Sequence, residues 1–134
     1  GTGARLVNIS ARNRVGTGTD ILIAGFYIAG TGTKRLLIRA VGPTIGGVPF
    51  NVPGALADPK IELYGANAVK ITENDTWDGS LSAIFASAGA FPFAPGSRDA
   101  ALVSTLNAGS SYSVQVKGAD GGTGEALVEI YELP

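Results

Sequence analysis

The residues best suited to chemistry lie in one polar segment around Trp77, the only tryptophan of the chain. Three acids stand in this segment, namely Glu73, Asp75 and Asp78. Calcium prefers several carboxylate and carbonyl oxygens, so the three acids are candidate calcium ligands, although their spacing is not that of an EF-hand loop. The alternative is that these side chains form turns with the backbone or are solvated.

Trp77 is also a candidate for stacking against a sugar ring, because an indole has an apolar face and a polar N–H. Tyr27, Tyr64, Phe50 and Phe91 could extend such a platform. The more common role of a tryptophan in this setting is to close one end of a β-sandwich. Trp77 is therefore a candidate glycan-stacking residue, with a purely structural role as the alternative.

Most catalytic chemistry lacks its usual residues in this chain, which contains no His, no Cys and no Met. No thiol or imidazole is available as nucleophile or base, and no His/Cys cluster can hold zinc. Nothing places Asp75 and Asp78 across a cleft, as glycoside hydrolysis requires. Gly16-Thr17-Gly18 does not extend to a phosphate-binding loop. We therefore expect no enzymatic activity, no catalytic residues and no cofactor other than the calcium considered above.

Arg39 stands alone as a charge in an apolar run, and Asp99 opens another such run. A charge inside a sheet is costly unless it is paired. The sequence therefore predicts that Arg39 bonds an acidic side chain or loop carbonyls, with Asp99 as the favoured partner. We expect this pair to fix a loop or a strand register rather than to act in catalysis.

The elements that must position these residues are short β-type runs separated by glycine. Strands are expected at 6–10, 21–28, 34–41, 60–64, 69–73, 99–106, 112–117 and 126–133. Ser80 could cap a single helix that ends near residue 90, because apolar residues recur there at helical spacing. This pattern predicts one all-β domain over residues 1–134. The expected fold is an antiparallel β-sandwich of about eight strands, jelly-roll or immunoglobulin-like, with one short helix near 80–90.

Two finer expectations concern the strands themselves. The run 21–28 is almost continuously apolar, which predicts a strand buried on both faces. The segment 30–33 resembles a hairpin loop, and the alternating runs 60–64 and 69–73 form a second expected hairpin.

The surface is expected to be largely uncharged. Charged residues make up 16% of the chain, its apolar residues 45%, and the net charge is −1. Ten Lys and Arg are spread among eleven Asp and Glu, so no nucleic-acid patch is expected. No apolar run reaches the roughly 18 residues of a membrane span. A neutral surface suits contact with copies of the same chain.

Recognisable motifs lie at 5–12, 15–18, 22–26, 37–43, 56–59, 74–77, 89–91, 96–102 and 122–131. Together they resemble a β-rich module, about 130 residues long, of large exported and cell-surface proteins of environmental bacteria. The last two expected strands also resemble, more weakly, the pre-peptidase C-terminal type of β-sandwich. The resemblance implies an extracellular or cell-surface location after removal of a signal peptide, and it carries no catalytic residues.

These observations favour a secreted, non-enzymatic structural protein that assembles with copies of itself as a filament, surface-layer or adhesion subunit. The expected contact is β-strand pairing between subunits through the first strand, namely Leu6, Val7, Asn8, Ile9 and Ser10. The alternatives are an extracellular carbohydrate-binding module that takes polysaccharide, and a passive spacer domain of a larger exported protein.

Overall fold

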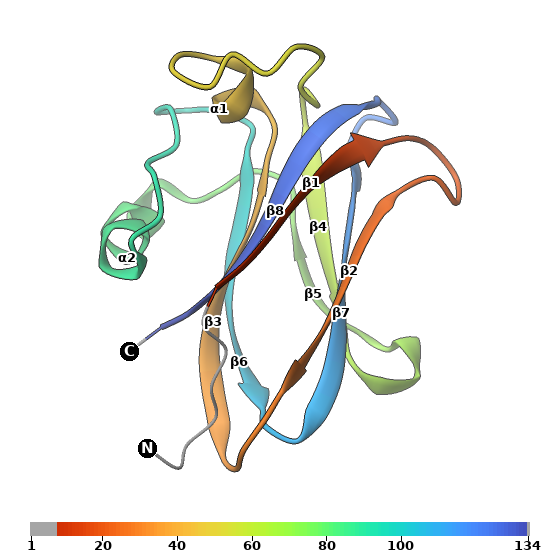
Figure 1. Ribbon diagram of the computed structural model, residues 1–134, viewed down its shortest axis with the longest axis vertical. Coiled ribbons are helices and arrows are strands. Elements are labelled where there is room, and N and C mark those ends of the chain that lie inside the picture. The colour runs from red at the N-terminus through yellow and green to blue at the C-terminus, as the bar shows by residue number, and fades with distance from the viewer. Residues whose placement is uncertain (1–7, 134) are drawn as a thin grey trace.

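A computed structural model describes residues 8–133 of the chain, which form eight β-strands and a few short helical turns (Figure 1). The strands are β1 (Asn8–Val15), β2 (Leu22–Ile28), β3 (Thr33–Val41), β4 (Pro59–Tyr64), β5 (Lys70–Asn74), β6 (Ala100–Asn107), β7 (Ser110–Gly118) and β8 (Gly124–Glu132). The α-helices are α1 (Pro43–Gly46) and α2 (Ser82–Ala88), and single 3₁₀ turns occupy Ala66–Ala68 and Gly79–Leu81.

The strands form two antiparallel sheets of four strands each. The first sheet has the order β1-β8-β3-β6 and the second has the order β2-β7-β4-β5. The antiparallel pairs β1–β8, β2–β7, β3–β6 and β4–β5 make the chain equivalent to one long hairpin that is rolled into a sandwich. The predicted all-β sandwich is confirmed, and of the two proposed variants this strand order is the jelly roll.

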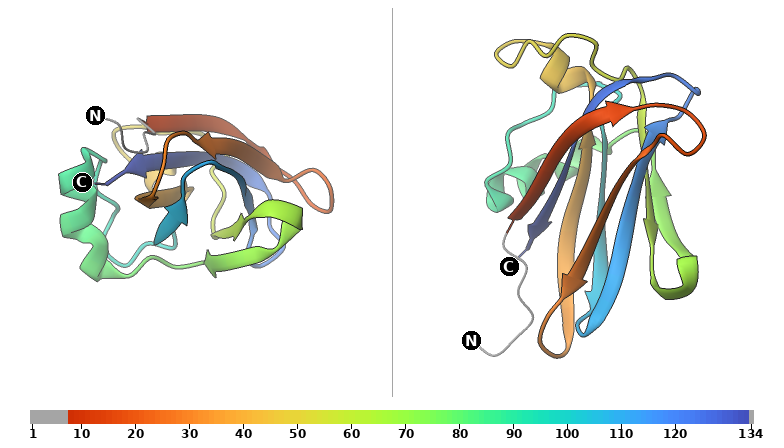
Figure 2. Two further views of the ribbon diagram at one scale, coloured as in Figure 1. Left: turned by 90° about the horizontal axis from the view of Figure 1, so that it is seen from below. Right: turned by 45° about the vertical axis from the view of Figure 1, so that its right-hand side comes forward.

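The sandwich has a main core and a second, smaller core. The main core lies between the sheets and includes Leu36 and Ile38 of β3 and Val114 and Val116 of β7. The second core lies on the outer face of the first sheet, where α2 and the segment after it pack (Figure 2). β3 serves both cores because its side chains alternate between the two faces of the sheet.

The single predicted helix is shorter than expected. Ser80 does not cap it: the Asp78 carboxylate caps the 3₁₀ turn that precedes the helix, accepting a hydrogen bond of 2.9 Å from the Ser80 N–H, and α2 itself has no side-chain cap. One 3₁₀ turn follows before α2 begins at Ser82. Gly89, with a φ of +77°, ends the helix in the left-handed region that favours glycine.

The connections differ from the expected hairpins in one respect. β4 and β5 pair as predicted, but the loop at 30–33 does not close a hairpin, because β2 and β3 belong to different sheets. This loop crosses the sandwich beside the β6–β7 loop. Ala108 N donates to Gly32 O of the crossing loop, and Gly109 N donates to Ile28 O at the end of β2. A short glycine-rich segment does not by itself show whether the chain forms a hairpin or crosses from one sheet to the other.

The prediction that the strand at 21–28 is buried on both faces was wrong. β2 is an edge strand of the second sheet, and Ile23 and Tyr27 are each 56% exposed. A continuous apolar run normally indicates that both faces of a strand are covered. In this molecule only one face of β2 meets the core.

Candidate functional site

The predicted assembly strand lies partly outside the described residues, since Leu6 and Val7 precede them. The rest belongs to β1, an edge strand of the first sheet. Asn8, Ile9 and Ser10 pair with Tyr131, Ile130 and Glu129 of the same chain. The strand also runs on to Val15, so the charged residues Arg12 and Arg14, expected to follow it, lie inside it.

β1 has little side-chain packing for its length. Residues 10–14 are all exposed, although Ala11 and Asn13 pair with core residues of β8 and therefore face inward. Val15 is fully buried, and Ile9 packs partly against the core. The strand is held mainly by its backbone hydrogen-bond ladder to β8.

The opposite edge of the first sheet, strand β6, is protected from pairing with another chain. The Ala101 N–H of edge strand β6 donates to Asn74 Oδ1 at 3.1 Å. The Tyr112 hydroxyl accepts from the Asn107 N–H and donates to the Asn107 carbonyl, both at 2.9 Å. Bonds of this kind occupy edge groups that would otherwise be available to another chain.

The predicted ion pair of Arg39 exists with a different acid. Arg39 is fully buried, and its Nε donates to Glu129 Oε1 at 2.8 Å. Its Nη2 lies 2.6 Å from the same oxygen without hydrogen-bond geometry, and its Nη1 donates to the Phe91 carbonyl at 2.6 Å. Glu129 is directly opposite Arg39 in the β3–β8 register. The acid was missed because the sequence does not reveal which strand lies beside β3.

Aromatic rings enclose the Arg39 guanidinium. Its central carbon lies 4.2 Å from the ring centroid of Phe93, 4.5 Å from that of Phe91 and 4.8 Å from that of Phe85. Such contacts gain strength when the cation is desolvated. The Tyr131 hydroxyl donates to the second oxygen of Glu129 at 2.8 Å. Burial, followed by this hydrogen bond, raises the pKa of Tyr131 to about 12.

Asp99, the partner predicted for Arg39, has another task. Its fully buried carboxylate accepts from the backbone N–H groups of Gly42 and Thr44, at 2.8 and 3.2 Å. The hydroxyls of Thr44 and Ser97 also bond it. The expectation that Asp99 fixes a loop was correct, but its partner is not Arg39. Asp99 instead accepts hydrogen bonds from the N-terminal backbone donors of α1.

Trp77 belongs to the second core. Its ring stacks on Phe85 at a centroid distance of 5.3 Å and meets Phe93 edge to face at 5.4 Å. It remains partly exposed. The structural alternative raised by the sequence therefore describes this contact, with the difference that Trp77 covers the outer face of a sheet rather than the end of the sandwich.

The candidate calcium ligands Glu73, Asp75 and Asp78 do not come together. Within residues 8–133, no group of three or more acidic side chains is placed to hold a metal ion. The Glu73 carboxylate is bonded by Lys70 and Lys60, and the Asp78 carboxylate caps the Ser80 N–H. The three acids are close in sequence but do not meet in the structure, because β5 ends at Asn74 and the chain then leaves the sheet.

The outer face of the second sheet carries an ion network centred on Glu62. Lys117 lies 2.6 Å from its carboxylate, Lys60 3.5 Å and Lys70 3.7 Å, and the Tyr64 hydroxyl donates to it at 2.9 Å. The hydrogen bond from Lys117 is the largest contribution that lowers the pKa of Glu62, which falls to about 2.

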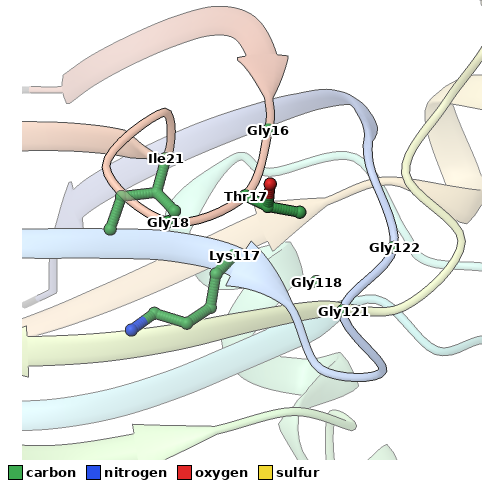
Figure 3. Close-up of a pocket in the computed structure, with 8 residues that line it drawn as sticks. All are labelled: Gly16, Thr17, Gly18, Ile21, Lys117, Gly118, Gly121 and Gly122. Atoms are coloured by element: carbon green, nitrogen blue, oxygen red, sulfur yellow. The ribbon is translucent and has the colours of Figure 1, made fainter.

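Among the hollows at the loops of residues 8–133, two differ in their walls. One, of about 290 Å³, is formed by the glycine turns Gly16–Gly18 and Gly118–Gly122 (Figure 3). Lys117 points away from these turns toward Glu62, so the hollow is walled mostly by backbone (Figure 3). The other, of about 570 Å³, is an apolar groove in which Val48 is 86% and Phe50 42% exposed.

Comparison with known proteins adds no family assignment. The chain matches no model of a protein family and no curated protein sequence. Among the helices of residues 8–133, none is long and apolar enough to cross a membrane.

Proposed function

We propose that this protein is a secreted, non-enzymatic structural subunit that assembles with copies of itself by exchanging β1. The observation that carries the proposal is the attachment of β1, which is an edge strand, exposes residues 10–14 and is held mainly by its ladder to β8. A strand held in this way leaves its place at a low cost in side-chain packing.

An identical strand from a second copy fits the vacated place. The eight register positions from Asn8–Tyr131 to Val15–Gly124 are the same whether β1 comes from its own chain or from another. Exchange of identical elements is a low-cost route to assembly, because every native contact is recovered. The segment between β1 and β2, residues 16–21, would act as the hinge.

The extracellular location in this proposal rests on the family resemblance, and the low content of charged residues, 16%, supports contact between copies. The carbohydrate-binding alternative is less favoured, because one face of the Trp77 ring is used against Phe85. The spacer alternative needs no exposed strand, so the behaviour of β1 distinguishes it from the proposal.

The test is to lock β1 onto its own β8. Arg12 and Leu127 are opposite each other, and the chain has no native cysteine, so R12C/L127C can form one disulfide. Oxidised at low concentration and freed of chains that are cross-linked to one another, this variant should form no polymers in size-exclusion chromatography or negative-stain electron microscopy. Reduction should restore the assembly of the unmodified chain.

A truncated chain provides the second measurement. Residues 16–134, checked for folding by circular dichroism, should bind a peptide of residues 1–15 and should not polymerise. The same peptide with Val15→Asp is the control, because it buries a charge at a fully enclosed position. Polymers that form equally well from oxidised R12C/L127C or from the truncated chain would refute strand exchange.

A further inference from the structure

β2 has the composition of an internal strand but lies at an edge. None of its seven residues, Leu22–Ile28, is charged, and Ile23 and Tyr27 are each 56% exposed on its outer face. Long, uncharged edge strands pair readily with other chains. The sequence of β2 therefore fits a strand that has a neighbour on both sides.

The backbone groups on the open side of β2 belong to three residues. The Ile28 carbonyl points toward β7, because it accepts from Gly109 N. N–H and C=O directions alternate along a strand, so those of Ile23, Gly25 and Tyr27 point away from β7. They face the side of β2 on which no strand of residues 8–133 pairs with it.

The remaining edges of the described sheets carry features that oppose pairing. β1 has Arg12 and Arg14, β5 has Lys70 and Glu73, and β6 has its ends capped by side chains. Charges and caps of this kind protect an edge from other chains. β2 has neither, which singles it out as the edge suited to a partner strand.

We propose that β2 pairs antiparallel with β2 of a second copy, about a two-fold axis at Gly25. The two second sheets would then join into one continuous sheet. This contact adds to the exchange of β1 and does not depend on it, because exchange uses β8 of the first sheet.

The symmetry fixes the register of the pair. With Gly25 opposite Gly25 of the second copy, Ile23 lies opposite Tyr27 of the second copy, and the reverse. These are the residues whose backbone groups face the open edge, so all three can form hydrogen bonds across the axis. On the outer face each Ile23 meets a Tyr27 ring, and β-branched–aromatic pairs across strands are favourable. An uncharged edge also brings no like charges together.

Gly25 permits a direct test of this geometry. A Cβ at this position would have only one neighbour within 4 Å, the Tyr112 carbonyl at 3.9 Å, so Gly25→Cys should fold. Paired Cα atoms across antiparallel strands lie about 5.5 Å apart, within the range of a disulfide. The variant should form a covalent dimer on mild oxidation at least about tenfold faster than Gly79→Cys, a control in open space. Equal rates would overturn the proposal.

Charge provides the second test, in the oxidised R12C/L127C background where β1 exchange is blocked. Sedimentation should show a dimer, which Ile23→Lys converts to a monomer. Ile71→Lys is the matched control, because Ile71 is 45% exposed on edge strand β5, and it should leave the dimer intact. A monomer before any β2 substitution, or an unchanged dimer after Ile23→Lys, would refute β2 pairing. Polymers formed by oxidised R12C/L127C would instead count against β1 exchange.

Discussion

The outer faces of the two sheets both carry ion networks, and the two networks differ in their surroundings. On the first sheet, Arg39 and Glu129 are 0% and 6% exposed beneath the aromatic rings beside α2. On the second sheet, Glu62 is similarly enclosed, but its lysine partners are solvent-accessible, with Lys70 45% exposed at its side chain. None of the helices of residues 8–133 covers that face (Figure 2).

This difference teaches what a charge contributes on each face. Beneath the aromatic rings, removing one partner leaves an uncompensated charge away from water, which is strongly destabilising. At the open face, water replaces a lost lysine, and the remaining lysines continue to neutralise Glu62. We expect the first network to be essential to its local packing and the second to adjust stability slightly.

Breaking the buried pair should have the largest effect. Glu129→Gln keeps the volume of the side chain but leaves Arg39 without its counter-charge, and it should lower the free energy of unfolding by about 3–5 kcal/mol. The double variant R39M/E129L removes both charges and should recover most of this loss. Urea denaturation measures both. A double variant at least as unstable as Glu129→Gln would contradict the role assigned to charge compensation.

Trp77→Ala should have the next largest effect, since it opens the aromatic layer over Arg39. The expected loss is about 2–3 kcal/mol, below the 3–5 kcal/mol of fully buried rings because Trp77 is partly exposed. Trp77→Phe keeps a ring against Phe85 and should lose less than half as much. Thermal unfolding followed by circular dichroism tests this. A stable Trp77→Ala protein that loses polysaccharide binding would instead favour the carbohydrate alternative.

The stability contributed by the ion network around Glu62 should depend on pH. The pKa of Glu62 is about 2 in the folded protein, below its ordinary value of 4.5. Its contribution to stability is therefore complete above pH 4.5 and is lost as the pH falls toward 2. The melting temperature of the native chain should exceed that of Glu62→Gln above pH 4.5, and the gap should narrow toward pH 2. A constant gap would contradict this assignment.

Lys70→Ala should have the smallest effect, below about 0.5 kcal/mol, because exposed ion pairs contribute little. Lys117→Ala should cost more, since Lys117 is the closest lysine to Glu62. Denaturation in low and high salt would compare the two variants. Equal losses would indicate that distance to Glu62 does not govern the contribution of each lysine.

The local pattern of the sequence was sufficient for most of the strands and insufficient for their neighbours, and it did not predict the short helix α1. The alternation in 60–64 and 69–73 predicted the β4–β5 hairpin correctly, because both strands are adjacent in the chain. The partner of Arg39 required knowledge that β8, 90 residues away, lies beside β3. Glu129 did leave a signal, since it stands between the apolar residues Val128 and Ile130, as Arg39 stands between Ile38 and Ala40.

β2 is the most instructive difference. Its apolar run predicted a strand covered on both faces, but one face is exposed, and no strand of residues 8–133 pairs with one of its edges. A hydropathy pattern records the environment that a residue meets in its final assembly, whereas one chain contains only part of that environment. The mismatch is therefore itself the reason to look for a second copy.

The sequence by itself determined the strands, their separation by glycine turns, and the need of Arg39 for an acid, because these follow from local periodicity and from the cost of burying charge. Only the tertiary structure decided the jelly-roll order, the pairing of Arg39 with Glu129, the place of Trp77 against Phe85 and the position of β2 at an edge. These depend on contacts between segments far apart in the chain, where many pairings satisfy the same local pattern and packing selects one.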